Sequence, residues 1–249
     1  MAVGDSFTEG LDDLTAAGSY RGWADLIARQ LAAQNSDFRY ANLAVRGRLL
    51  GQVVADQAPA ALRMAPDLVS FAAGGNDVLR REFNVDRTHA TLDRVIGELS
   101  ATGAQVLMFT IADLATVLPK LIRPRLQIFN NMVRVVAATH RVTLVDLWAD
   151  NGFRRPQMWS EDRLHLSTYG HRRVAARVLD ALGLPGEAQW RAELPSGPAV
   201  SWLSARRADL RWTRQHLAPW IYRRLTGTSS GDIVSAKRPE LSPFDTAGD

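Results

Sequence analysis

The chain has 249 residues, of which 46% are hydrophobic, and its formal net charge is +4 at pH 7. This size allows one sizeable core, and the lack of cysteine excludes disulfide bonds, thiolate metal sites and cysteine nucleophiles. Acidic residues lie between the basic ones along most of the chain, so we expect no nucleic acid partner. No apolar run reaches the about 20 residues that cross a bilayer, and no leader-like segment is visible, which favours a cytoplasmic protein.

Short apolar segments alternate with longer segments of helical periodicity along the first three quarters of the chain. We predict strands at residues 1–3, 38–44, 67–73, 105–111 and 142–147, and helices at 23–33, 49–64, 92–102, 126–139 and 169–182. This alternation predicts an α/β fold with a five-stranded parallel sheet and helices on both faces. The first strand is so short that we expect the true start of the protein to lie upstream.

The strand–helix alternation of the sequence does not continue after residue 186, and we expect residues 1–186 to form one domain. Residues 187–249 are then a C-terminal extension. Residues 204–225 are predicted to form an amphipathic helix with leucines on one side and arginines on the other. We expect this helix to dock on the domain, the alternative being contact with an anionic membrane surface. From Thr226 onward the chain is rich in Gly, Ser and Pro and is predicted to be disordered.

The first of several polar motifs, Gly4-Asp5-Ser6, follows the first predicted strand. Glycine permits a tight turn there, and Ser6 then lies near a helix N-terminus. Backbone N–H groups and the helix dipole favour developing negative charge at such a position. Ser6 is therefore a candidate nucleophile. The alternative is an ordinary helix N-cap, because serine is common at that position.

The later part of the chain supplies the base that a serine nucleophile needs. A serine hydroxyl is activated when an imidazole accepts its proton, and a carboxylate on the other ring nitrogen orients the imidazole. Asp162 lies three residues before His165 in a segment without helical periodicity, so the carboxylate can turn back onto the ring. The alternative is a surface loop with a solvated Asp. The other histidines lack such an acid or fall inside a helix. They are His89, His140, His171 and His216.

Motifs after the next two strands can supply donors for the oxyanion of an acyl-transfer reaction. The Gly47 N–H is not obstructed by a side chain, and the Asn76 amide can donate from the loop Gly74-Gly75-Asn76-Asp77. The Ser6 N–H would be a third donor, and each such donor contributes about 3 kcal/mol of transition-state stabilisation. Each motif alone could be a simple turn or an Asx cap. Because the carboxyl ends of parallel strands share one edge of a sheet, we predict that they form one site.

The four blocks resemble those of the SGNH (GDSL-type) hydrolase family, which is named for a Ser, a Gly, an Asn and a His. The corresponding residues are Ser6, Gly47, Asn76 and His165, with Asp162 three positions before the histidine. The resemblance implies a three-layer α/β/α sandwich with a flavodoxin-like parallel five-stranded sheet. It implies a catalytic triad of Ser6, His165 and Asp162, and an oxyanion hole of Ser6, Gly47 and Asn76. No cofactor or metal is implied.

The resemblance also implies a GDSL-type esterase or lipase that cleaves esters of small or lipid-like acyl groups through an acyl-enzyme intermediate. Acyl transfer to an alcohol and deacetylation of acylated carbohydrates would use the same residues and stay open as alternatives. A non-catalytic binding protein on the same fold is a further alternative. The loops at 79–86 and 113–125 follow predicted strands and are expected to form walls around the acyl group.

Overall fold

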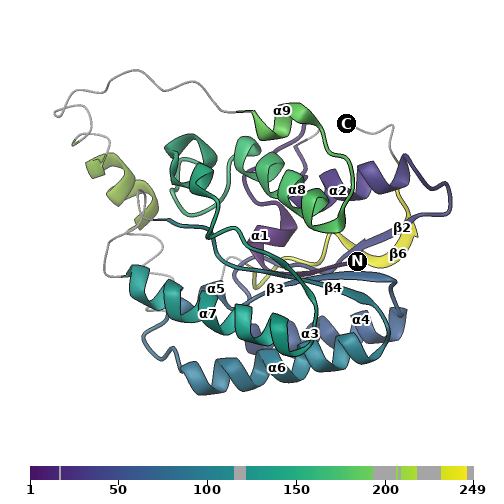
Figure 1. Ribbon diagram of the computed structural model, residues 1–249. Helices are drawn as coiled ribbons and strands as arrows, with labels where there is room; N and C mark the ends of the chain where they lie inside the picture. The colour runs from purple at the N-terminus through teal and green to yellow at the C-terminus, as the bar shows by residue number, and fades with distance from the viewer. Residues whose placement is uncertain (17, 115–121, 193–205, 207–208, 218–230, 246–249) are drawn as a thin grey trace.

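A six-stranded sheet with the strand order β5-β4-β3-β1-β2-β6 lies between two layers of helices (Figure 1). The structure is a computed structural model that describes residues 1–16, 18–114, 122–192, 206, 209–217 and 231–245. Five strands run parallel to one another: β1 (Ala2–Gly4), β2 (Arg39–Asn42), β3 (Leu68–Ala72), β4 (Gln105–Phe109) and β5 (Thr143–Val145). The sixth, β6 (Arg238–Pro243), is antiparallel to β2.

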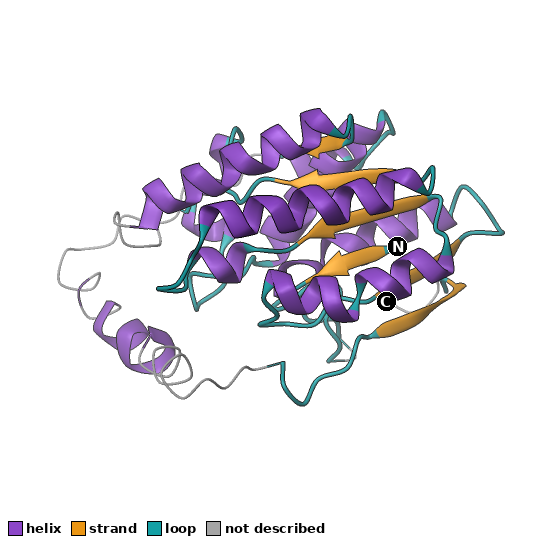
Figure 2. Ribbon diagram, turned by 90° about the horizontal axis from the view of Figure 1, so that it is seen from below, coloured by secondary structure: helices purple, strands orange, loops and turns teal. Residues whose placement is uncertain are grey.

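Helices cover both faces of the sheet, and Figure 2 shows helices lying over the strands and running roughly along them. On one face lie α2 (Gly22–Ala32) and α8 (Thr168–Leu182), which pack against each other. On the other face lie α3 (Leu50–Asp56), α4 (Ala58–Met64), α6 (Val85–Ala101) and α7 (Arg123–Thr139). The short helices are α1 (Ser6–Glu9), α5 (Gly75–Val78) and α9 (Ala188–Arg191), with 3₁₀ turns η2 (Asn151–Arg154) and η3 (Pro156–Met158).

The core lies on both faces of the central strands. Val106, Leu107 and Met108 of β4 are each buried, as a strand covered by helices on both sides requires. The helix α6 contributes the buried residues Val95 and Ile96 from one layer. The prediction of an α/β fold with a sheet between helical layers is confirmed, and the predicted parallel arrangement holds for β1 to β5.

One predicted helix, at residues 49–64, is divided in the structure into α3 and α4 at Gln57. Pro59 lacks the N–H that an uninterrupted helix would use, which favours a break at this point. The Gln57 side chain is buried and forms two hydrogen bonds with the end of β1. Its Oε1 accepts from Gly4 N and its Nε2 donates to Gly4 O, each at 2.9 Å. The Gln57 side chain at this break therefore stabilises the end of the strand that leads into Ser6.

The prediction that the chain is disordered beyond Thr226 is wrong for residues 238–243, which form β6. The prediction of five strands is wrong for the same reason. This segment contains two prolines and has no strand pattern, but proline is tolerated on an edge strand. Phe244 packs edge-on against Tyr40 of β2, with 5.6 Å between ring centroids. The order comes from the open edge of β2 and not from local propensity.

The predicted helix at 204–225 lies mostly outside the described residues, which include only residues 206 and 209–217 of it. Leu210, one of the leucines on the predicted apolar side, is 65% exposed. Trp212 does contact the domain, because its Nε1 donates to the backbone oxygen of Asp162 at 2.9 Å. The boundary at residue 186 and the docking of the whole helix stay predictions. None of the described helices is both long and apolar enough to cross a membrane.

Candidate active site

Ser6 lies where β1 turns into α1. A Cβ on Gly4 would come within 2.4 Å of the Ala72 oxygen on the adjacent strand β3, so only glycine fits at this point. Asp5 is the N-cap of α1, since its Oδ1 accepts a hydrogen bond from Phe7 N at 3.1 Å. Ser6 is therefore the first residue of the helix and not its cap, which leaves the hydroxyl for another partner.

The loop that carries Asp162 folds the carboxylate back over the following histidine. Asp162 Oδ1 accepts hydrogen bonds from the backbone N–H groups of Leu164 and His165, both at 2.9 Å. Ser160 Oγ donates to the same oxygen at 2.7 Å. Arg163 occupies the left-handed region, with φ of 60°, and makes the sharp turn possible. The spacing of three residues thus works through a tight turn and not through a helix.

Ser6, His165 and Asp162 form one continuous hydrogen-bonded chain. His165 Nε2 lies 3.0 Å from Ser6 Oγ, although the two residues are 159 positions apart in the sequence. The other ring nitrogen, Nδ1, lies 2.5 Å from Asp162 Oδ2. The structure therefore brings together the three residues that the sequence predicted for the triad.

The shifted pKa values of Asp162 and His165 suit a histidine that acts as a base. Burial disfavours an ionised Asp162, but hydrogen bonds from His165 and Ser160 hold the pKa of its carboxyl well below the usual range. Burial also disfavours a charged His165, yet the hydrogen bond and charge of Asp162, with smaller effects of Asp12 and Asp5, raise the pKa of the imidazole above its ordinary value. The pair therefore stabilises an imidazolium, as proton transfer from a serine requires.

The predicted oxyanion donors lie around Ser6 in different ways. Asn76 borders the cavity beside Ser6, and its Nδ2 donates to Asp5 Oδ2 at 3.2 Å and to Arg48 O at 3.1 Å. Gly47 follows β2 in the left-handed region, with φ of 73°. It is not among the described residues that line the cavity. The structure thus places Asn76 at the cavity and Gly47 in a neighbouring turn.

Several residues that position these loops were not singled out from the sequence. Asp77 Oδ2 accepts from Leu50 N at 2.9 Å and so joins α5 to the start of α3. Glu9 is buried, and its Oε2 accepts from Arg46 N at 2.8 Å, next to Gly47. Asp77 stands in the motif that was identified for its asparagine, whereas no local pattern marks the pairing of Glu9 with Arg46.

Ser6, His165 and Asn76 are among the residues that line a cavity of about 150 Å³. Most of its other walls are apolar side chains, which include Phe109, Ile111, Leu126, Phe129 and Phe153. Of the loops expected to form its walls, Leu79 and Leu114 do line it, and residues 115–121 lie outside the described part. The site therefore combines a polar end with an apolar interior.

Two of the remaining histidines, His171 and His140, have structural partners. His171 is buried, with Nδ1 accepting from Trp23 N and Nε2 donating to Leu11 O, both at 3.2 Å. Burial lowers the pKa of His171 to about 4, so it stays neutral. His140 Nε2 lies 2.8 Å from Asp93, an acid that sequence spacing did not reveal.

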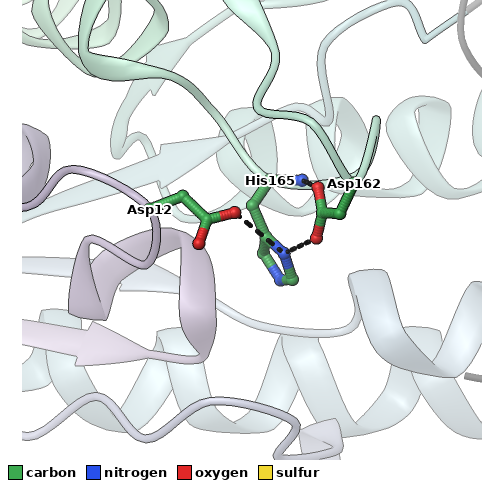
Figure 3. A group of neighbouring side chains, drawn as sticks. All are labelled: Asp12, Asp162 and His165. Atoms are coloured by element: carbon green, nitrogen blue, oxygen red, sulfur yellow. Dashed lines mark hydrogen bonds and ion pairs between the residues drawn. The ribbon is translucent and has the colours of Figure 1, made fainter. Parts of the chain in front are cut away.

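A second carboxylate, that of Asp12, lies near the same imidazole (Figure 3). Its Oδ2 is 3.9 Å from His165 Nδ1. Asp12, Asp162 and His165 offer ligand atoms within 4.8 Å of one another, a spacing that could hold a cation. A metal on Nδ1 would have to displace the proton shared with Asp162, so the arrangement suits a triad better. No sequence pattern distinguishes Asp12 from the adjacent Asp13.

Comparisons with known proteins identify the family of this chain. Residues 2–173 match the model of the GDSL-like lipase/acylhydrolase family. Esterase TesA of Pseudomonas aeruginosa is 26% identical over 183 residues, which are 73% of this chain and 86% of TesA. The crystal structure of TesA has a TM-score of 0.61 at 27% identity and covers 73% of this chain and 96% of its own. A catalytic mutant of Axe2, an acetylxylan esterase from Geobacillus stearothermophilus, has a TM-score of 0.64 at 20% identity, over 75% of this chain and 95% of Axe2.

Proposed function

The chain belongs to the GDSL-like lipase/acylhydrolase family and is a carboxylic ester hydrolase, and we propose that Ser6 is its nucleophile, with His165 as base and Asp162 as the orienting acid. The observation that carries this proposal is the chain of contacts from Ser6 Oγ to His165 Nε2, at 3.0 Å, and from His165 Nδ1 to Asp162 Oδ2, at 2.5 Å. These distances meet the geometric requirement of nucleophile, base and orienting group.

In the first step Ser6 Oγ attacks the acyl carbon of the ester while His165 Nε2 takes the hydroxyl proton. The imidazolium is stabilised by Asp162, and the C–O bond to the leaving alcohol breaks as His165 returns the proton to that oxygen. In the second step His165 removes a proton from water, which attacks the acyl-enzyme. The Ser6 oxygen is then reprotonated and the carboxylic acid leaves.

The oxyanion of both steps is assigned to the N–H groups of Ser6 and Gly47 and to the Asn76 amide. Support for Asn76 comes from its position on the cavity next to Ser6. Both Nδ2 contacts, to Asp5 and to Arg48, lie at 3.1–3.2 Å. Asn76 therefore donates to the substrate by exchanging one of these hydrogen bonds for the oxyanion.

The cavity favours an apolar acyl group larger than acetyl. Its volume of about 150 Å³ equals that of an apolar protein cavity known to hold benzene, a molecule of six carbons. Aromatic and aliphatic walls such as Phe129 and Ile111 would replace water around an acyl chain. We therefore place the preferred substrates among esters with an acyl chain of roughly six carbons.

The nucleophile is tested by the Ser6→Ala variant with a nitrophenyl hexanoate substrate. We expect turnover to fall by several orders of magnitude, on the order of 10⁶-fold for a triad nucleophile, and labelling by a fluorophosphonate probe to disappear. Ser36→Ala, in an exposed turn, is the matched control and should behave like the wild type. Wild-type rates in Ser6→Ala, with an unchanged melting temperature, would remove Ser6 from this role.

Deacetylation of carbohydrates is the second candidate, since the structural relative Axe2 is named as an acetylxylan esterase. The two candidates differ in acyl length, so kcat/KM should be measured for nitrophenyl esters from two to twelve carbons and for acetylated sugars. A maximum near six carbons supports the acyl cavity. A maximum at acetate together with activity on acetylated sugars supports the deacetylase. Product analysis with an added alcohol separates hydrolysis from acyl transfer.

A further inference from the structure

We propose that Asp12 stabilises the imidazolium that forms on His165 while Ser6 attacks the substrate, and that it thereby increases the rate of acylation. The proposal rests on the proposed function, because it takes His165 as the general base. Asp12 acts through His165, so it is a positioning residue that works by its charge.

Two carboxylates lie near the same ring nitrogen of His165. Asp162 Oδ2 is 2.5 Å and Asp12 Oδ2 is 3.9 Å from His165 Nδ1. Figure 3 shows the two acids approaching the ring from opposite sides. The single Nδ1 proton belongs to the short contact with Asp162, and 3.9 Å is too long for a hydrogen bond. Asp12 therefore contributes charge, which interacts with the imidazolium and hardly at all with the neutral ring.

The loop after α1 holds Asp12 in this place. Its φ is 71°, in the left-handed region that glycine adopts at lower cost and that Asp tolerates. On one side Leu11 N donates to Ser6 O at 3.2 Å. On the other side Asp13 is buried and accepts from Thr168 Oγ1 at 2.7 Å, close to His165 in the chain. A carboxylate at a position that favours glycine supports a role for its charge.

The groups that face the imidazole explain why a second acid matters. They are Asp162, Asp12 and Asp5, with the neutral His171 nearby. Burial opposes a charge on His165, and the three carboxylates together offset this and raise the pKa of the ring. Burial raises the pKa of Asp5 itself to about 6, so Asp5 gives less charge at mildly acidic pH. The Asp12 side chain is 33% exposed, so water weakens its effect without removing it.

The Asp12→Asn variant tests this inference, because asparagine keeps the shape and also tolerates a left-handed backbone. We expect the plateau of kcat/KM to fall about three- to tenfold and the acid limb of its pH profile to move about 0.5 to 1 unit lower. The two profiles should then converge or cross at low pH. A merely structural defect would lower the rate by one factor at every pH. Asp37→Asn, in the exposed turn before β2 and at the other end of the sheet, is the charge-matched control.

A second measurement does not depend on activity. The imidazole signals of His165 can be titrated by NMR in Ser6→Ala and in Ser6→Ala with Asp12→Asn, and the pKa should be lower in the double variant. Equal pKa values, or an acid limb of Asp12→Asn that coincides with the wild type, would overturn the inference. Turnover that survives in Ser6→Ala would instead contradict the proposed function, so the two failures are distinguishable.

Discussion

Lys237, just before β6, connects the C-terminal segment to the end of α1 and the loop that follows it through hydrogen bonds. Its Nζ donates to the backbone oxygens of Glu9 and Arg21, both at 2.7 Å, and lies 3.2 Å from Tyr20 O. The fourth contact, at 2.8 Å, is an ion pair with Asp25 of α2. The ammonium group thus contacts three carbonyl groups and one carboxylate where α1, α2 and β6 meet.

Replacement of Lys237 by Met should destabilise the fold by about 3 kcal/mol. Breaking a buried ion pair costs about 3–5 kcal/mol, because a charge is left without its partner. The lower end applies here, since the side chains of Lys237 and Asp25 are 22% and 15% exposed and water can reach them. For a protein of this size the change corresponds to a fall of roughly 6–12 °C in melting temperature.

A double-mutant cycle with Asp25→Asn separates the ion pair from the other contacts of Lys237. Asp25 also accepts from Tyr40 OH at 2.8 Å, a contact that an asparagine can keep. Burial raises the pKa of Asp25 above its ordinary value, although Lys237 opposes this. Without Lys237 that pKa rises further, so Asp25 is neutralised at a higher pH and the cost of Lys237→Met should shrink as the pH falls.

The assay is urea or thermal unfolding of the full chain at several pH values. Arg94→Met is the control, because Arg94 pairs with Glu98 on the surface and both are largely exposed, so its effect should stay below about 1 kcal/mol. We expect a coupling of about 1–2 kcal/mol between Lys237 and Asp25. A Lys237→Met variant that melts within a degree of the wild type, or strictly additive effects in the cycle, would refute the reasoning.

Two further expectations concern pH. The pKa of His165 is raised and its ring must be neutral to act as base, so kcat/KM should rise with pH through an inflection above 6.5. His171 is already neutral and should add no second inflection to the pH profile. An inflection well below 6.5 would contradict this expectation. Asp150 contacts Arg173 at 2.6 Å and Arg177 at 2.7 Å, and although burial opposes its charge, these arginines lower its pKa to about 2. The stabilisation that the ionised Asp150 gives to the fold is therefore present above the unfolded pKa of 3.8 and is lost as the pH falls toward 2. Asp150→Asn should lower the urea midpoint at pH 7 but hardly change it at pH 2. Equal losses at both pH values would argue against the ion pairs.

Much of the site could be predicted because its parts are local. Gly4-Asp5-Ser6 and Asn76 follow predicted strands, and parallel strands bring such loops to one edge of the sheet. Asp162 and His165 needed only a turn of four residues to meet. Helix boundaries were less accurate. The helix α6 begins at Val85, seven residues before the predicted start, because its first turns are polar and lack the apolar periodicity.

The sequence by itself thus determined the class of fold, since strands and helices follow from local periodicity. It also gave the order of the four blocks, and the short spacing of Asp162 and His165 together with the family resemblance supplied the residues that we propose as the triad. Only the tertiary structure decided that Asp12 rather than Asp13 faces His165, and that Lys237 and β6 return to the start of the chain. Those contacts join residues far apart in the sequence or choose between identical neighbours. Their free energy comes from partners that no local pattern specifies, such as the open edge of β2 and the carbonyl groups around Lys237.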